Sequence, residues 1–271
     1  MSLFEHQARA RRLRAHQLAQ IGARYDDGTR ALVEVLVEAS AGLHPMQRLP
    51  LAALAFPALR RRPRPQLTTF RIALRELIDA DGRVTLAEYC LARLINVQVL
   101  GTPDPARTPP AGASKLIEVE HDVRDVLAVL AAHGHADVEA ARRAYALGLL
   151  EALPAATIAY APPSSWVDAL DRALPRLDRL APAGEELPVR ALTRAVAADG
   201  ALCAAEAELL RAIAPHCTAR CRRSALRPAR FRCRKDCLRD PDDVYEGLRR
   251  NRRAGPAAFR RGRHVQRLQS P

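Results

Sequence analysis

Four cysteines late in the chain have the spacing of a metal site. Cys217, Cys221, Cys233 and Cys237 follow the pattern C-x3-C-x11-C-x3-C, and His216 precedes the first of them. Thiolate pairs at short spacing can complete the tetrahedral coordination of a zinc ion. The arginines between these cysteines could instead contact nucleic-acid phosphates. A four-thiolate zinc module and a basic nucleic-acid arm are therefore two interpretations of this segment.

Two Asp-Gly sequences carry the carboxylates that come nearest to a calcium loop. In the first, Asp79, Asp81 and Glu88 match ligand positions in the back half of an EF-hand loop, and Gly82 matches its glycine. Leu77 stands at the first ligand position, where an oxygen is needed. The second copy has alanine at two of the ligand positions. Helix capping explains these residues, and we assign no metal ligand among them.

The same two sequences have the pattern of a helix end followed by a helix start. Glycine suits the left-handed position that ends a helix. Thr85 and Glu88 form a capping box, in which the hydroxyl and the carboxylate each accept from a backbone amide of the other residue. In the second copy Cys203 replaces the threonine and Glu206 follows, so we expect a weaker cap there.

Other clusters that resemble catalytic residues are explained by helix ends. Ser164 and Ser165 are N-cap candidates, and Asp168 is a first-turn acid. The closest histidine pair, His133 and His135, straddles a glycine that ends a helix. The sequence has no glycine-rich phosphate loop. We therefore predict no catalytic residue and no cofactor site.

Apolar residues recur at three- and four-residue spacing up to about Ile213, which predicts helices throughout this region. No stretch alternates with period two for long enough to make a strand, so the predicted fold class is all-α. The expected helices are marked by the stripe Leu32, Val35, Leu36 and Ala39, by the stripe Leu67, Phe70, Leu74, Leu77 and Ile78, and by the segments 85–100, 119–133, 138–153, 166–177, 186–198 and 203–213.

Charge and composition divide the chain into four parts. Residues 1–100 and 115–213 are two helical halves, each with one Asp-Gly break, and residues 101–114 form a linker rich in proline and glycine. Of the net charge of +13, residues 214–271 carry +12, from 17 basic and 5 acidic residues. The arginines at 60, 61, 62 and 64 lie among prolines, and we expect a solvated loop there.

The two breaks and their order resemble known families. ADGRVTLAE and ADGALCAAEAELLRAI resemble TerB-like helical modules. LPLAALAFPALRRR, the first break, and LDRLAP followed by AVAADG resemble the cytoplasmic C-terminal region of bacterial HtpX-like membrane zinc metallopeptidases. This resemblance covers roughly residues 18–213. It implies two TerB-like halves, a cytoplasmic location, and a membrane anchor only in a part upstream of this region.

The resemblance carries over no catalytic residue. The chemistry of that family rests on His-Glu-x-x-His, which places two zinc ligands on one helix face with a glutamate base between them. This chain has no His-Glu dipeptide. The resemblance therefore implies the non-catalytic end of such a protein, with residues 1–16 as an internal start.

A shifted reading frame is a third interpretation of the tail. The composition changes at Ala214, directly after the last predicted helix. The resembled family continues there as Cys-Ala-Ala-Leu-His-Cys-Pro-Leu-Pro-Pro. A GC-rich encoding of that string, read with its first base dropped, gives the observed residues from Ala214 to Arg223. This interpretation accounts for more of the tail than the other two, and it predicts disorder over residues 214–271.

These patterns lead to one predicted function and two alternatives. The prediction is a non-catalytic helical interaction or regulatory module that binds a protein partner in the cytoplasm. One alternative is a free-standing TerB-like stress-response scaffold. The other is a nucleic-acid binder that uses the basic tail, although most of the chain is nearly neutral in charge, so we expect no nucleic-acid partner.

Overall fold

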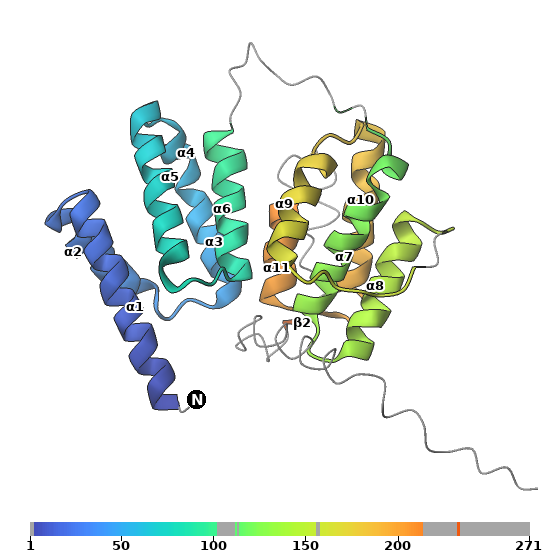
Figure 1. The fold of residues 1–271 in the computed structure, drawn as a ribbon, viewed down its shortest axis with the longest axis horizontal. Helices are drawn as coiled ribbons and strands as arrows, with labels where there is room; N and C mark the ends of the chain where they lie inside the picture. The colour runs from blue at the N-terminus through green and yellow to red at the C-terminus, as the bar shows by residue number, and fades with distance from the viewer. Residues whose placement is uncertain (1–2, 102–111, 113, 156–157, 214–231, 234–271) are drawn as a thin grey trace, which may run out of the picture.

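The computed structural model describes residues 3–101, 112, 114–155, 158–213 and 232–233. These residues are almost entirely helical. Strands among them are the two-residue β1 (Ala201–Leu202) and β2 (Arg232–Cys233), which pair in parallel. The all-α prediction is therefore confirmed (Figure 1). Residues 102–111 and 113 of the predicted linker at 101–114, and Cys217, Cys221 and Cys237 of the tail, lie outside the described residues.

The N-terminal half, residues 3–101, consists of helices joined by short turns. In chain order these are α1 (Leu3–Arg24), α2 (Asp27–Ser40), α3 (Pro45–Leu54), α4 (Phe56–Arg60), α5 (Arg64–Ile78), the 3₁₀ turn η1 (Asp79–Asp81), α6 (Leu86–Ile95) and the π-helical turn η2 (Asn96–Leu100). In Figure 1, α1 and α2 lie at one edge of the molecule, and α5 lies between them and α6.

The C-terminal half, residues 114–213, surrounds a central helix. In chain order its elements are the 3₁₀ turn η4 (Leu116–Val119), α7 (Glu120–Gly134), α8 (Val138–Ala152), α9 (Trp166–Leu177), α10 (Pro182–Val196), β1 and α11 (Ala204–Ile213). Helix α7 contacts α8, α9, α10 and α11, and every residue from Asp125 to Gly134 is buried. Because α7 is covered by four helices, it forms the centre of this half's core.

Side chains at the predicted boundaries start several of these helices. Asp137 accepts a hydrogen bond from the backbone N–H of Ala140 at 2.8 Å, which caps α8. Ser165 Oγ accepts from the N–H of Asp168 at 3.3 Å, which caps α9. Such caps satisfy amides that have no partner within the helix. The expectation that this serine is an N-cap rather than a nucleophile is consistent with its geometry.

The proline-interrupted stretch after residue 44 is helical, which the sequence pattern did not predict. Pro45, Pro57 and Pro65 lie in the first turns of α3, α4 and α5, where a missing N–H costs no hydrogen bond. The solvated loop expected at residues 60–64 is an exposed turn over residues 61–63, with a helix end on either side. Arg60 ends α4 and donates to the carbonyl of Gln98, and Arg64 begins α5.

The two halves pack against each other through α6 and α11. Helix α6 contacts α11, and α11 also contacts α3. Cys90 and Leu94 of α6 are buried in a core that both halves share. Polar contacts reinforce this packing, because the hydroxyl of Tyr89 donates to Asp171 at 2.9 Å and Arg93 pairs with Asp178. The buried contact places both Asp-Gly breaks on one packed body.

Candidate functional site

The first Asp-Gly break is a capped turn on the surface. Gly82 adopts a φ of +70°, in the left-handed region. Asp81 Oδ1 accepts from the N–H of Arg83 at 3.0 Å, and Glu88 Oε2 accepts from the N–H of Thr85 at 2.9 Å. The hydroxyl of Thr85 accepts from the N–H of Glu88 at 3.3 Å, which completes the predicted capping box. Both predictions for this turn are confirmed.

The carboxylates of this break serve the turn and its neighbours. Asp79 lies 3.6 Å from the Nε of Arg75, while Asp81 and Glu88 hold backbone amides. Within the described ranges, no group of three or more histidine, cysteine, aspartate or glutamate side chains is placed to hold a metal ion. The predicted zinc cysteines, Cys233 apart, fall outside those ranges.

The second break repeats the first almost atom for atom. Gly200 has the same φ of +70°. Asp199 Oδ1 accepts from the N–H of Ala201 at 3.0 Å, and Glu206 Oε2 accepts from the N–H of Cys203 at 2.9 Å. Cys203 Sγ accepts from the N–H of Glu206 at 3.4 Å. Sulfur thus takes the place of the threonine hydroxyl, as a longer and weaker acceptor.

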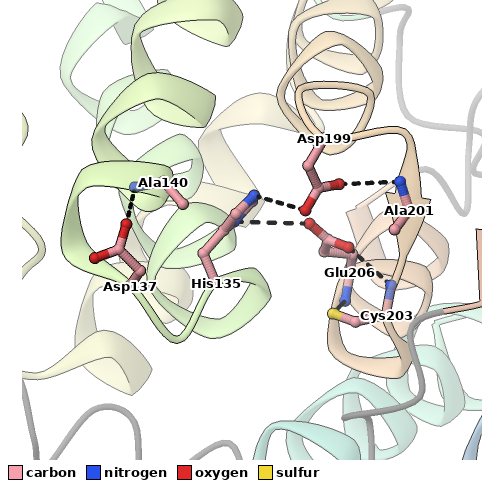
Figure 2. Close-up of polar contacts among 7 residues, drawn as sticks. All are labelled: His135, Asp137, Ala140, Asp199, Ala201, Cys203 and Glu206. Carbon is pink, nitrogen blue, oxygen red and sulfur yellow. Dashed lines mark hydrogen bonds and ion pairs between the residues drawn. The ribbon is translucent and has the colours of Figure 1, made fainter.

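The two breaks differ in the residues that pack against their capping glutamates. Glu206 is 1% exposed, and it faces the end of α7 (Figure 2). The imidazole of His135 lies between two carboxylates, with Nε2 3.6 Å from Asp199 Oδ2 and Nδ1 3.9 Å from Glu206 Oε1. We call His135, Asp199, Cys203 and Glu206 the His135 cluster.

A glycine makes this close approach possible. A Cβ added to Gly134 would lie 2.5 Å from Glu206 Oε1 and 2.9 Å from its Cδ. Any other residue at position 134 would therefore displace the carboxylate that caps α11. The glycine that was predicted to end α7 has this second role, which its position in the sequence could not indicate.

Burial sets the ionisation of the groups around the cluster. It raises the pKa of Glu206 to about 7, and the hydrogen bonds from Cys203 oppose that rise. Burial also lowers the pKa of His133 to about 4. The ring of His133 meets Trp166 edge-on, with centroids 5.2 Å apart. The fold thus favours a neutral His133 and a protonated Glu206.

The His135 cluster is better suited to holding helices together than to catalysis. A general base must reach a substrate proton within hydrogen-bond distance. The side chain of His135 is 3% exposed, so a substrate has no access to it without movement of α7 or α11. The cluster joins the end of α7 to the turn before α11, and its chemistry is that of a buried packing contact.

Ionisable groups are also buried where the halves meet. Burial raises the pKa of Glu208 to about 7, while Arg211 and Arg48 lower it. Burial raises the pKa of the Cys90 thiol, and the nearby Glu208 carboxylate adds to that rise. The residues facing Glu208 thus come from α3, α6 and α11. These groups belong to the contact between the halves.

The N-terminal half has an apolar groove of about 430 Å³. It lies between the α1–α2 pair and the helices α4 and α5. Its lining residues are Ile21, Tyr25, Thr29, Val33, Leu59, Arg62, Gln66, Leu67, Phe70, Ala73, Leu74 and Leu77. Arg62 is the charged member of this lining. Most of the predicted α5 stripe therefore lines a groove.

Helix α2 extends this apolar surface outward. None of its residues is buried, although its apolar stripe was predicted from core-like spacing. Leu32, Val35 and Leu36 are 60%, 62% and 56% exposed. Leu32 and Leu36 lie three residues after the groove residues Thr29 and Val33, so the stripe adjoins the edge of the groove and runs from there away from it to Val35. We call Leu32, Val35 and Leu36 the α2 stripe.

The features of the candidate site that the sequence did not predict depend on long-range packing. The contact of His135 with Glu206 and the groove between α2 and α5 join segments far apart in the chain. The only advance signals were the repeated Asp-Gly pattern and the helical stripe of α2. Among the described helices, none is both long and apolar enough to cross a membrane.

Comparisons with known proteins add no relative. No protein-family model matches the chain, and neither curated proteins nor solved structures give a match.

Proposed function

We propose that this protein is a non-catalytic helical module that binds a protein partner through the groove and the α2 stripe. The observation that carries this proposal is the exposure of a contiguous apolar face on α2 beside an apolar groove. Soluble proteins seldom leave such a face uncovered unless it serves an interaction. Recognition of a partner segment in an apolar groove is a common use of such a surface.

The free energy of burying apolar side chains favours a state in which a partner covers the α2 stripe. Burying a leucine or valine side chain contributes about 1.5–3 kcal/mol relative to exposure. The isolated chain forgoes this contribution at Leu32, Val35 and Leu36, each of which is more than half exposed. A partner that covers them would recover part of it, after the cost of ordering both surfaces.

The buried His135 cluster has no part in this function. It lies in the half of the molecule that does not hold the groove, and its histidine and glutamate are buried. The proposal extends to a regulatory role beside a membrane zinc metallopeptidase, for which the support is the order of the motifs in the sequence. The scaffold alternative would use the same surface.

Selection from a library of short random peptides tests the proposal. The bait would be the full chain, and selected peptides would be measured against the variant L32E/L36E. Both substitutions lie at exposed positions, so the fold should tolerate them. We expect a loss of affinity of about tenfold or more, because each adds a charge to an apolar contact.

Leu150→Glu supplies the matched control. Leu150 is 61% exposed on α8, in the other half of the molecule. The proposal expects the control to bind the selected peptides as well as the unsubstituted protein does. Failure to select any peptide, or selection of peptides that bind L32E/L36E equally well, would overturn it.

A further inference from the structure

The length of the groove limits what can lie in it. Along α5 the lining runs from Gln66 to Leu77, twelve residues of one helix separated by eleven steps. At a rise of 1.5 Å per residue this is about 16 Å, or three helical turns. A single short helix laid along α5 would match that length. An extended strand of the same reach would leave its backbone amides without partners against an apolar wall.

The residues that line the groove are apolar, so a bound partner should contact them with apolar side chains. Phe70, Leu74 and Leu77 line one wall from α5, and Ile21 and Val33 line the facing side. Partners of such grooves present apolar residues at i, i+3 or i+4, and i+7 of one helix. Three turns hold three such anchors, so the groove fits one face of an amphipathic helix.

The net charge around the groove indicates which polar residues the other face of the bound helix should carry. Residues 1–101 contain 15 arginines and 9 acidic residues, a net charge of +6. Residues 102–213 contain 11 basic and 16 acidic residues, a net charge of −5. The half that holds the groove is therefore the basic half of the folded body. Its field favours an acidic partner.

One guanidinium stands at the groove itself. Arg62 lines the end of the groove nearest the start of α5. Two other arginines near the groove already have partners on this chain, since Arg24 pairs with Glu76 and Arg30 with Asp27. An acidic side chain at one end of the bound helix would lie closest to Arg62.

We propose that the occupant of the groove is a three-turn amphipathic helix with apolar anchors on one face and acidic residues on the other. This inference rests on the proposed function and specifies its partner class. The helix lies along α5, its acidic residues lie toward solvent and Arg62, and the α2 stripe covers its outer edge.

Defined peptides test the inference on the full chain. Three helical peptides would share the same leucine anchors and carry glutamate, glutamine or lysine at every polar position. Fluorescence anisotropy would give each affinity at low and moderate salt. We expect the glutamate peptide to bind about tenfold more tightly than the lysine peptide at low salt, with a smaller difference at higher salt.

A charge reversal locates the acidic contact. Arg62→Glu should weaken binding of the glutamate peptide about three- to tenfold. Arg83→Glu is the matched control, because Arg83 is exposed in the turn after η1 and does not line the groove. Its affinity for the glutamate peptide should equal that of the unsubstituted protein.

The outcomes separate the two proposals. Equal binding of the three peptides, tightest binding of the lysine peptide, or equal effects of Arg62→Glu and Arg83→Glu would overturn the acidic-helix inference. If random peptides that depend on the α2 stripe are still selected, the proposed function stands. If the peptides fail but vesicles of phosphatidylserine and phosphatidylcholine bind through the α2 stripe, the surface is a membrane contact and both proposals are overturned.

Discussion

The two Asp-Gly breaks have the same local geometry in very different surroundings. Both have a glycine at φ +70°, an aspartate that holds the turn, and a glutamate that caps the next helix. In the C-terminal half His135 covers the capping glutamate, so Glu206 is 1% exposed, although Asp199 and Gly200 remain at the surface. In the N-terminal half the corresponding Glu88 is only half-buried, and the neighbouring helices leave an apolar groove open.

The repeated motif therefore shapes a turn and caps a helix in both halves, and it does not by itself mark a functional site. The local hydrogen bonds are alike, so they cannot account for a function proposed for only one half. What distinguishes the halves is packing. Helix α7 is covered by four neighbours, whereas α2 buries none of its residues. The surface that we propose for an interaction belongs to the half with incomplete packing.

The largest loss of stability is expected on substituting Gly134, which packs against the buried capping glutamate of the second break. Gly134→Ala places a Cβ 2.5 Å from Glu206 Oε1, so the carboxylate must move and release its cap on α11. We expect a loss of about 2–3 kcal/mol in the free energy of unfolding, measured by urea denaturation. Gly42→Ala is the control, since an added Cβ there meets nothing within 4 Å. A loss of stability equal to that of the control would contradict the prediction, because it would show that the Glu206 carboxylate can move aside without cost.

The next effect is a pH dependence that only the buried break should have. The pKa of Glu206 is raised to about 7, so the native protein retains a proton that the unfolded chain releases above about 4.5. The stability linked to this proton is complete below pH 4.5 and is lost as the pH rises through 7. Glu206→Gln should therefore lower the loss of stability between pH 5 and pH 8 by about 2 kcal/mol.

Thermal melting of Glu206→Gln and the unsubstituted protein across that range would measure this effect. The groups that face Glu206 are His135, Asp199 and Cys203, and all three remain in the variant. Glu208 and His133 also remain, so their contributions are common to both curves. Gly42→Ala, which changes no titrating group, serves as the control. Parallel curves for Glu206→Gln and the unsubstituted protein would contradict the prediction.

The smallest effect distinguishes the two capping atoms. Thr85→Ala removes the hydroxyl that accepts from Glu88 N–H and should cost about 1 kcal/mol. Thr85→Cys copies the sulfur cap of the second break and should cost about half as much, because sulfur is a weak acceptor. Urea denaturation of both variants would check this. Equal losses would mean that the sulfur in the second break contributes nothing as a cap.

The sequence predicted the local parts of this structure well. Helical periodicity gave the all-α class, and Gly82, Thr85 and Ser165 acted at helix ends as their residue types suggest. These predictions succeeded because turns and caps depend on neighbours within about four residues. No helix was predicted over residues 45–60, where Pro45 and Pro57 lie in first turns, which tolerate proline, and Pro50 lies inside α3.

The parts that depend on tertiary packing could not be predicted. The α2 stripe has the spacing of a core face, and spacing alone cannot say whether another helix covers it. The contact between His135 and Glu206 likewise depends on how α7 meets α11. Periodicity identifies which residues share a face of a helix, while the groove and the cluster arise from how those faces are paired.

Amide hydrogen exchange with and without the glutamate peptide tests the central claim most directly. We expect the peptide to slow exchange in α2 and α5, which flank the groove, and to leave α7 and α8 unchanged. Slower exchange confined to α7–α11, or unchanged exchange in α2 and α5 while the peptide is bound, would contradict it.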